Sequence, residues 1–204
     1  FVLAGGTKLP LHRLFLLFGF AAGLMFLVGL TPLSAPDEGA HYLMATNMAD
    51  QLFFGGTGVG PERIMTFDGI TAHENNMAGY EKMASDLFAG FTPSADAALS
   101  TGIGMNLGEL PAVLLMAPVR ALGGNALQCL YAGRLGMLLF YVLITALAIR
   151  LTPRFKLALL VAGLMPMCLH QGASVSYDGY LTSMAFRTSA LLLRAIVSGS
   201  KHSA

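Results

Sequence analysis

The chain has 204 residues, of which 55% are apolar and only 11% are charged, whereas an ordinary soluble domain carries about 25% charged residues. The scarcity of charge and the mean hydropathy of +0.65 exclude an ordinary soluble enzyme, a disordered segment and a coiled coil. The composition predicts an all-α membrane protein, with residues 1–204 as a single membrane domain and the lipid bilayer as its surroundings.

The first apolar segment covers residues 14–33 and contains no charged side chain. Its length is about the 20 residues that a helix needs to cross a bilayer. A signal peptide is excluded because the apolar core is too long and no A-x-A site follows it. Gly19 and Gly23 form a G-x-x-x-G pattern, which is typical of close helix packing but also arises by chance among 24 glycines. We predict that this segment is the first transmembrane helix.

Residues 34–110 form a long, partly helical outer loop that carries most of the acidic side chains. Ten of the 11 acidic residues lie between Asp37 and Glu109, against two basic residues. This excess excludes nucleic acid as a partner, because a phosphate backbone needs a basic surface. A capping sequence that starts at Ser34, followed by spaced apolar residues, predicts an amphipathic helix over residues 35–53 on the membrane surface.

Three side chains that can accept or donate a proton lie at the start of this helix: Asp37, Glu38 and His41. Asp37 and His41 are four residues apart, as are Glu38 and Tyr42, so each pair shares a face of the helix. Two carboxylates and an imidazole beside a membrane can accept a proton, orient a hydroxyl or bind a divalent cation. The alternative is that the acids only favour the helix dipole, which explains Asp37 and Glu38 but not His41.

Three further apolar segments, at residues 126–149, 157–175 and 179–197, complete a prediction of about four transmembrane helices. Residues 110–124 are apolar but short and contain two prolines, which indicates an interfacial or re-entrant segment. If this segment spanned the membrane, the orientation of everything after it would invert. With four spans, the basic clusters all lie on one side of the membrane. The positive-inside rule predicts that this side is the cytoplasm, so the N-terminus is predicted to be cytoplasmic as well. These clusters are Lys8 with Arg13, then Arg150, Arg154 and Lys156, then Arg194 and Lys201.

Two ionisable residues outside the loop stand out because they lie in or beside apolar segments. Arg134 interrupts the second predicted span, where it can bind a phosphate or form a structural ion pair. Asp178 follows the third span, where it can serve a site or cap the next helix. The predicted topology brings Asp178 and the Asp37–Glu38 pair to the same side of the membrane, where they can converge on one site.

The run Pro36–Asp–Glu–Gly–Ala–His41–Tyr42 after the first span resembles the signature of a bacterial family of predicted polytopic membrane proteins of unknown function. That family is similar to the GT-C superfamily of glycosyltransferases. Further matches follow in the same order at Gly133–Arg134–Leu135, Pro166–Met167 and Ser174–Val–Ser–Tyr177–Asp178.

The resemblance implies a multi-pass protein of the bacterial inner membrane that transfers sugar from a polyprenyl-phosphate-linked donor on the outer face. In such enzymes an acid of the first outer loop acts as base or helps to bind a divalent cation, magnesium or manganese. That role falls on Asp37 or Glu38, with His41 in support. Substrate contacts fall on Asp178, Arg134, Tyr42 and Tyr177.

Family members are usually longer, and this chain begins at Phe1 rather than Met. We therefore expect it to be the front portion of a larger protein. Two alternatives to an enzyme stay open from the sequence: a non-catalytic membrane module or truncated remnant, and a transporter fragment. The transporter ranks last because we find no internal repeat. The sequence gives no oligomeric state.

Overall fold

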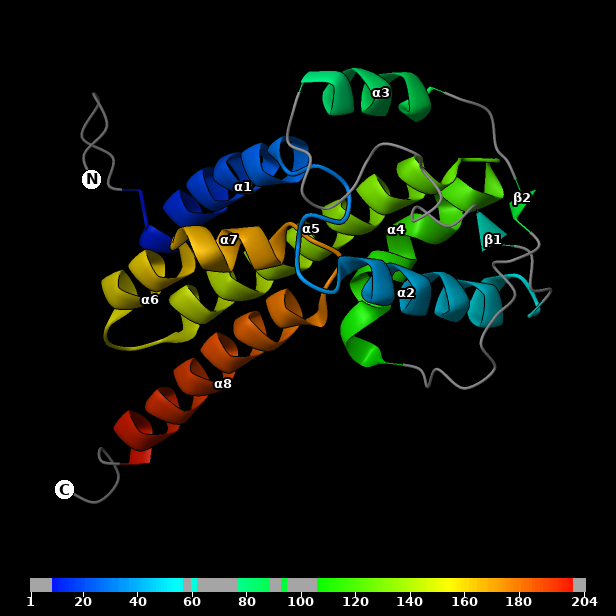
Figure 1. Cartoon of the computed structure of the whole chain (residues 1–204). Helices are drawn as coiled ribbons and strands as arrows, with labels where there is room; N and C mark the ends of the chain where they lie inside the picture. The colour runs from blue at the N-terminus through cyan, green and yellow to red at the C-terminus, as the bar shows by residue number, and fades with distance from the viewer. Residues whose placement is uncertain (1–8, 57–59, 62–76, 89–92, 95–105, 200–204) are drawn as a thin grey trace.

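The computed structural model describes residues 9–56, 60–61, 77–88, 93–94 and 106–199, and this part of the chain is almost entirely helical (Figure 1). The elements in chain order are α1 (Leu11–Gly29), α2 (Glu38–Phe53), β1 (Gly60–Pro61), α3 (Met77–Leu87), β2 (Pro93–Ser94), the 3-10 helix η3 (Leu107–Glu109), α4 (Leu110–Ala121), α5 (Ala126–Leu151), α6 (Lys156–Gly163), α7 (Pro166–Gly172) and α8 (Tyr177–Gly199). The predicted all-α class is confirmed, since β1 and β2 are an antiparallel pair of two residues each. Of the predicted outer loop 34–110, positions 57–59, 62–76, 89–92 and 95–105 lie outside the described residues.

The long helix α5 lies at the centre of the bundle and packs against α1, α4 and α8. It begins with a capping box, in which the Asn125 side chain accepts the backbone N–H of Gln128 and the Gln128 side chain accepts that of Asn125. Together with α1, it is long and apolar enough to cross a membrane; within the described ranges, two helices meet this condition. The first predicted span corresponds to α1, although α1 ends at Gly29 because Leu30 is extended and Thr31–Pro32 follows.

The segment 157–175, predicted as one continuous span, is instead two short helices, α6 and α7. Met165 between them is extended, with φ −60° and ψ 136°. Pro166 causes the break, because proline disfavours the helical conformation of the residue before it and itself suits the first position of a helix. The fourth predicted segment corresponds to α8, and the short segment 110–124 corresponds to α4.

Helix α2 begins at Glu38 rather than at residue 35, and one of its faces is buried in the protein. Ser34 does not cap it, because the Ser34 hydroxyl donates to the carbonyl of Thr31. Tyr42, Ala45, Met48 and Ala49 of α2 enter a core shared with α4 and the start of α5. These four positions of α2 therefore pack on protein, whereas Leu52 and Phe53 at the end of the helix are exposed.

The two ends of the bundle differ in charge. The start of α1, the turn between α5 and α6 and the end of α8 lie together at one end, whereas α2 and α4 lie at the other (Figure 1). Arg150 and Lys156 lie close enough to His12 to act on it electrostatically. Basic side chains from segments far apart in the chain thus gather at one end, as the sequence predicts.

Candidate functional site

A buried ion pair between Glu38 and Arg134 joins the two elements that carry the sequence signature. Both side chains are 0% exposed. The Nε and Nη2 atoms of Arg134 donate to the two carboxylate oxygens of Glu38 over 2.7 and 2.6 Å. The remaining donors go to backbone carbonyls at the end of α1, those of Leu27, Leu30 and Thr31. All five N–H donors of the guanidinium are therefore engaged, so Arg134 forms a structural ion pair and has none left for a phosphate.

Both carboxylate oxygens of Glu38 are likewise occupied by hydrogen bonds. Besides Arg134, its Oε2 accepts the backbone N–H of Leu33 and its Oε1 accepts that of Val175. Leu33 has a φ of 62°, a left-handed conformation unusual for leucine, and the bond to Glu38 helps to hold it there. A carboxylate with four hydrogen bonds and no exposure is not available as a base or as a metal ligand, contrary to the expectation for Glu38.

The expected divalent cation does not fit the residues that the structure describes. A magnesium or manganese ion needs several oxygen ligands, but both oxygens of Glu38 are taken. Within the described ranges, no group of three or more His, Cys, Asp or Glu side chains is arranged to hold a metal ion.

His41 forms the second buried pair, and its partner is Glu109 rather than Asp37. Its Nδ1 lies 2.6 Å from Oε1 of Glu109, the last residue of η3. His41 is 7% exposed and Glu109 is 0% exposed. The other carboxylate oxygen of Glu109 is buried and has no hydrogen-bond partner among the residues that the structure describes. The edge of one ring meets the face of the other where His41 packs on Tyr177, with ring centroids 4.6 Å apart and planes at 88°.

Two further acids lie close to this pair. The hydrogen bond that His41 donates to Glu109 raises the pKa of His41 above 6.5; burial opposes the shift, and the negative charges of Glu109, Asp178 and Asp37 add to it. Asp37 is exposed and Asp178 is half-buried. We call Asp37, His41, Glu109 and Asp178 the His41 cluster. Asp37 and Asp178, which the predicted topology places on one side of the membrane, both act on His41 here.

Tyr42 is not positioned to contact a substrate, contrary to expectation. Its side chain is 2% exposed and packs in the core shared by α2, α4 and α5. Its hydroxyl donates to the carbonyl of Ala126 over 3.2 Å. By contrast, Tyr177 is 36% exposed beside His41, where it forms part of the wall of the cluster.

Glu109 is the member of the cluster that the sequence analysis missed. It lies 68 positions from His41, so no helical or strand spacing connects the two. The available signal was its place as the last acid of the outer loop, directly before the apolar segment 110–124. An acid at the edge of an apolar segment is a functional candidate in a membrane protein.

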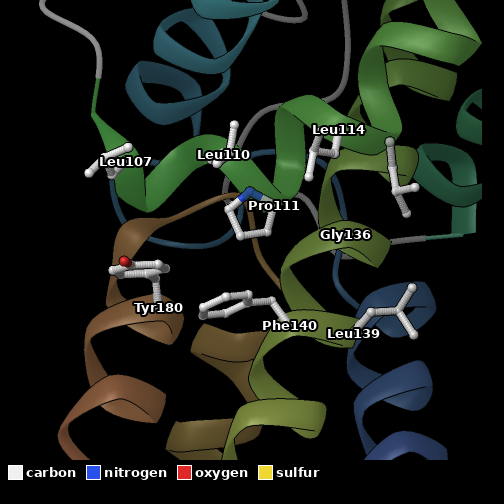
Figure 2. Close-up of a pocket in the computed structure, with 9 residues that line it drawn as sticks. Leu107, Leu110, Pro111, Leu114, Gly136, Leu139, Phe140 and Tyr180 are labelled. Carbon is white, nitrogen blue, oxygen red and sulfur yellow. The ribbon is translucent and has the colours of Figure 1, made fainter.

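An apolar groove of about 400 Å³ runs between α4, α5 and α8 (Figure 2). Leu107 and Leu110, which flank Glu109 in the chain, line one wall. Phe140 and Tyr180 stack on the opposite side, with ring centroids 4.9 Å apart. The volume is in the range of pockets that hold small molecules, and the carbon-rich lining suits an apolar chain.

The pH dependence of stability tests the His41–Glu109 pair. Because the pKa of His41 is raised in the folded state, its protonation stabilises the fold fully below pH 6.5, and this stabilisation is lost as the pH rises through the raised pKa. We expect the thermal midpoint of the full chain in detergent to fall over that window, and to fall less in Glu109→Gln. Glu81→Gln, which alters an exposed acid of α3, is the control. An unchanged slope in Glu109→Gln would contradict the pairing.

A comparison with protein-family models finds one described as "Predicted membrane protein (DUF2142)", which matches residues 20–204. Neither a comparison with curated proteins nor one with solved structures gives a match. The matched range includes both buried pairs, the His41 cluster and the apolar groove.

Proposed function

The chain belongs to the predicted membrane protein family DUF2142, and from this premise we propose that it is a GT-C-like glycosyltransferase module. It uses a polyprenyl-phosphate-linked sugar at the outer face of the bacterial inner membrane. The observation that carries this proposal is that Leu107 and Leu110, on either side of Glu109 in the chain, line the apolar groove, so that the groove and the His41 cluster share the segment from η3 to the start of α4. A lipid-linked sugar has the same division, with a polar head joined to a long apolar chain.

The chemistry of sugar transfer needs what the cluster offers. The oxygen of an acceptor hydroxyl forms a bond to C1 of the sugar, and the bond from C1 to the phosphate oxygen breaks with its electron pair on the phosphate. The hydroxyl proton goes to a base. The negative charges of Glu109, Asp178 and Asp37 all act on His41, and three carboxylates repel a phosphate. The cluster therefore binds the acceptor hydroxyl and takes its proton, and it does not bind the donor phosphate.

The proposed topology has four spans, with the N-terminus in the cytoplasm and the His41 cluster outside. The gathering of basic side chains at the opposite end of the bundle supports it. In this topology α6 and α7 cross the membrane as a broken helix. Helix α4, with 12 residues, is too short to cross.

The test is a deletion of the gene in its host, complemented with the full chain and with variants. The readout is the sugar content of envelope polymers and the amount of unused polyprenyl-phosphate sugar. We expect the deletion to remove one sugar modification. Asp37→Asn should lower its rate, because the variant removes a negative charge that acts on His41. Glu81→Gln should restore the modification fully. Unchanged envelope sugars and donor lipid in the deletion strain would refute the proposal.

A non-catalytic membrane module is the second candidate, and one observation favours it. Three residues of the signature, Glu38, Arg134 and Tyr42, are buried and occupied by internal bonds, so part of the motif serves the fold. This candidate predicts normal envelope sugars with Asp37→Asn and Asp178→Asn, and loss of folded protein with Glu38→Gln.

A further inference from the structure

We propose that His41 is the base of this site and that Glu109 is its positioning residue, holding the imidazole so that Nε2 accepts the proton of the acceptor hydroxyl. This inference rests on the proposed function and goes beyond it, because the family resemblance gave the role of base to an acid next to the first span.

The geometry fixes which nitrogen of His41 is free. An ionised carboxylate only accepts hydrogen bonds, so the 2.6 Å contact with Glu109 requires the proton of the neutral ring to be on Nδ1. Its lone pair is then on Nε2, which makes no hydrogen bond to any residue in the described part of the chain. A carboxylate that orients a histidine through Nδ1 is the arrangement used in hydrolase triads.

The second carboxylate oxygen of Glu109 gives independent support. Glu38 and Glu109 are both 0% exposed, yet Glu38 makes four hydrogen bonds, whereas Oε2 of Glu109 makes none with the described part of the chain. An unpartnered buried oxygen costs stability, so a fold that needed Glu109 only for structure would satisfy it as it satisfies Glu38. The free oxygen lies beside His41, where it increases the negative potential on the ring.

The surrounding charges allow His41 to hold the proton that it takes. Glu109 faces it from η3, Asp178 and Tyr177 from α8, and Asp37 from the start of α2. The three carboxylates stabilise the imidazolium that forms. In the reaction the hydroxyl O–H bond breaks as the new bond to C1 forms, the phosphate leaves with the electron pair, and the proton rests on Nε2 before it passes to water.

The first experiment reads the tautomer directly and does not depend on activity. The full chain, labelled with ¹⁵N in its histidine rings, is titrated in lipid nanodiscs by NMR, and His41→Gln assigns the His41 signals among the five histidines. We expect the wild-type ring to lose its Nε2 proton on deprotonation. Glu109→Gln should lower the titration midpoint and populate the Nε2–H tautomer. Glu109→Asp should restore the Nδ1–H form in part.

Matched variants separate orientation from charge. Asp178→Asn should lower the midpoint and leave the tautomer unchanged, because Asp178 acts on His41 only through its charge. Glu81→Gln should change neither quantity. A wild-type ring with its neutral proton on Nε2, or a tautomer that does not respond to Glu109→Gln, would overturn the dyad even if sugar transfer is observed.

The second experiment ties the dyad to transfer. We expect Glu109→Gln to lower kcat by about 10- to 100-fold with KM for the lipid-linked donor unchanged, and to move the acidic limb of the pH–rate profile to lower pH. A lower kcat with an unmoved limb would overturn the role of His41 as base while leaving the glycosyltransferase intact. If no transfer occurs but the tautomer responds, the proposed function and the catalytic role fail together, and the pairing of His41 with Glu109 stands.

Discussion

Replacing Arg134 with methionine is expected to lower the free energy of unfolding by about 3 to 5 kcal/mol, the usual cost of leaving one partner of a buried ion pair alone. The change leaves the Glu38 carboxylate buried without a counter-charge and removes the donors to three carbonyls at the end of α1. Glu38→Gln should cost a similar amount, because it leaves a buried guanidinium without a counter-charge.

Reversible unfolding of the full chain in mixed micelles measures this cost. Arg154→Met is the matched control, since Arg154 is exposed in the turn before α6, and we expect it to change stability by less than about 0.5 kcal/mol. A double variant, Glu38→Gln with Arg134→Met, should cost less than the sum of the single changes because the two residues interact directly. Equal effects of Arg134→Met and Arg154→Met would refute the structural role of Arg134.

Replacing Gly136 with alanine is expected to cost about 1 to 3 kcal/mol, because α4 and α5 touch backbone to backbone at this residue. A Cβ on Gly136 would overlap the carbonyl oxygen of Pro111 and lie 2.9 Å from its carbonyl carbon. A backbone group cannot rotate away as a side chain can, so α4 would have to shift. The shift would also change the groove, since both residues line it (Figure 2).

Two other glycines calibrate this result. At Gly29 a Cβ meets nothing within 4 Å, so Gly29→Ala should leave stability unchanged or raise it slightly. At Gly23 a Cβ meets only the side chain of Leu138, which can adjust, so Gly23→Ala should fall between the two. Thermal midpoints of the three variants in one detergent give the order. Losses of equal size at Gly29 and Gly136 would show that the contact with Pro111 does not limit packing.

The positions of the long helices could be predicted because they depend on local composition. The apolar runs located α1 and α5 to within a few residues. The break between α6 and α7 was visible in the sequence as Pro166. Hydropathy did not reveal it, because hydropathy depends only on composition and not on whether the backbone at Met165 can be helical. The burial of α2 could not be predicted, because Met48 and its apolar neighbours suit lipid and helix contacts equally well.

The candidate site could be predicted only in part. Asp37, His41 and Asp178 were identified from their types and positions, and the structure brings them together. The roles of Glu38 and Glu109 could not be assigned, because they depend on partners 96 and 68 positions away. Asp37 and Glu38 are neighbouring acids of similar chemistry, but Asp37 is exposed whereas Glu38 is buried in an ion pair. Only their tertiary contacts distinguish them.

The convergence of distant segments on Arg134 has a consequence for how the protein is made. The end of α1, the first residue of α2 and the backbone before α8 are all tied, directly or through Glu38, to one side chain in α5. During synthesis, α1 and α2 are made before α5, so their contacts with Arg134 can form only after Arg134 has left the ribosome. Until then the Glu38 carboxylate stays in water. Its burial accompanies the formation of the ion pair that joins the first half of the chain to the second.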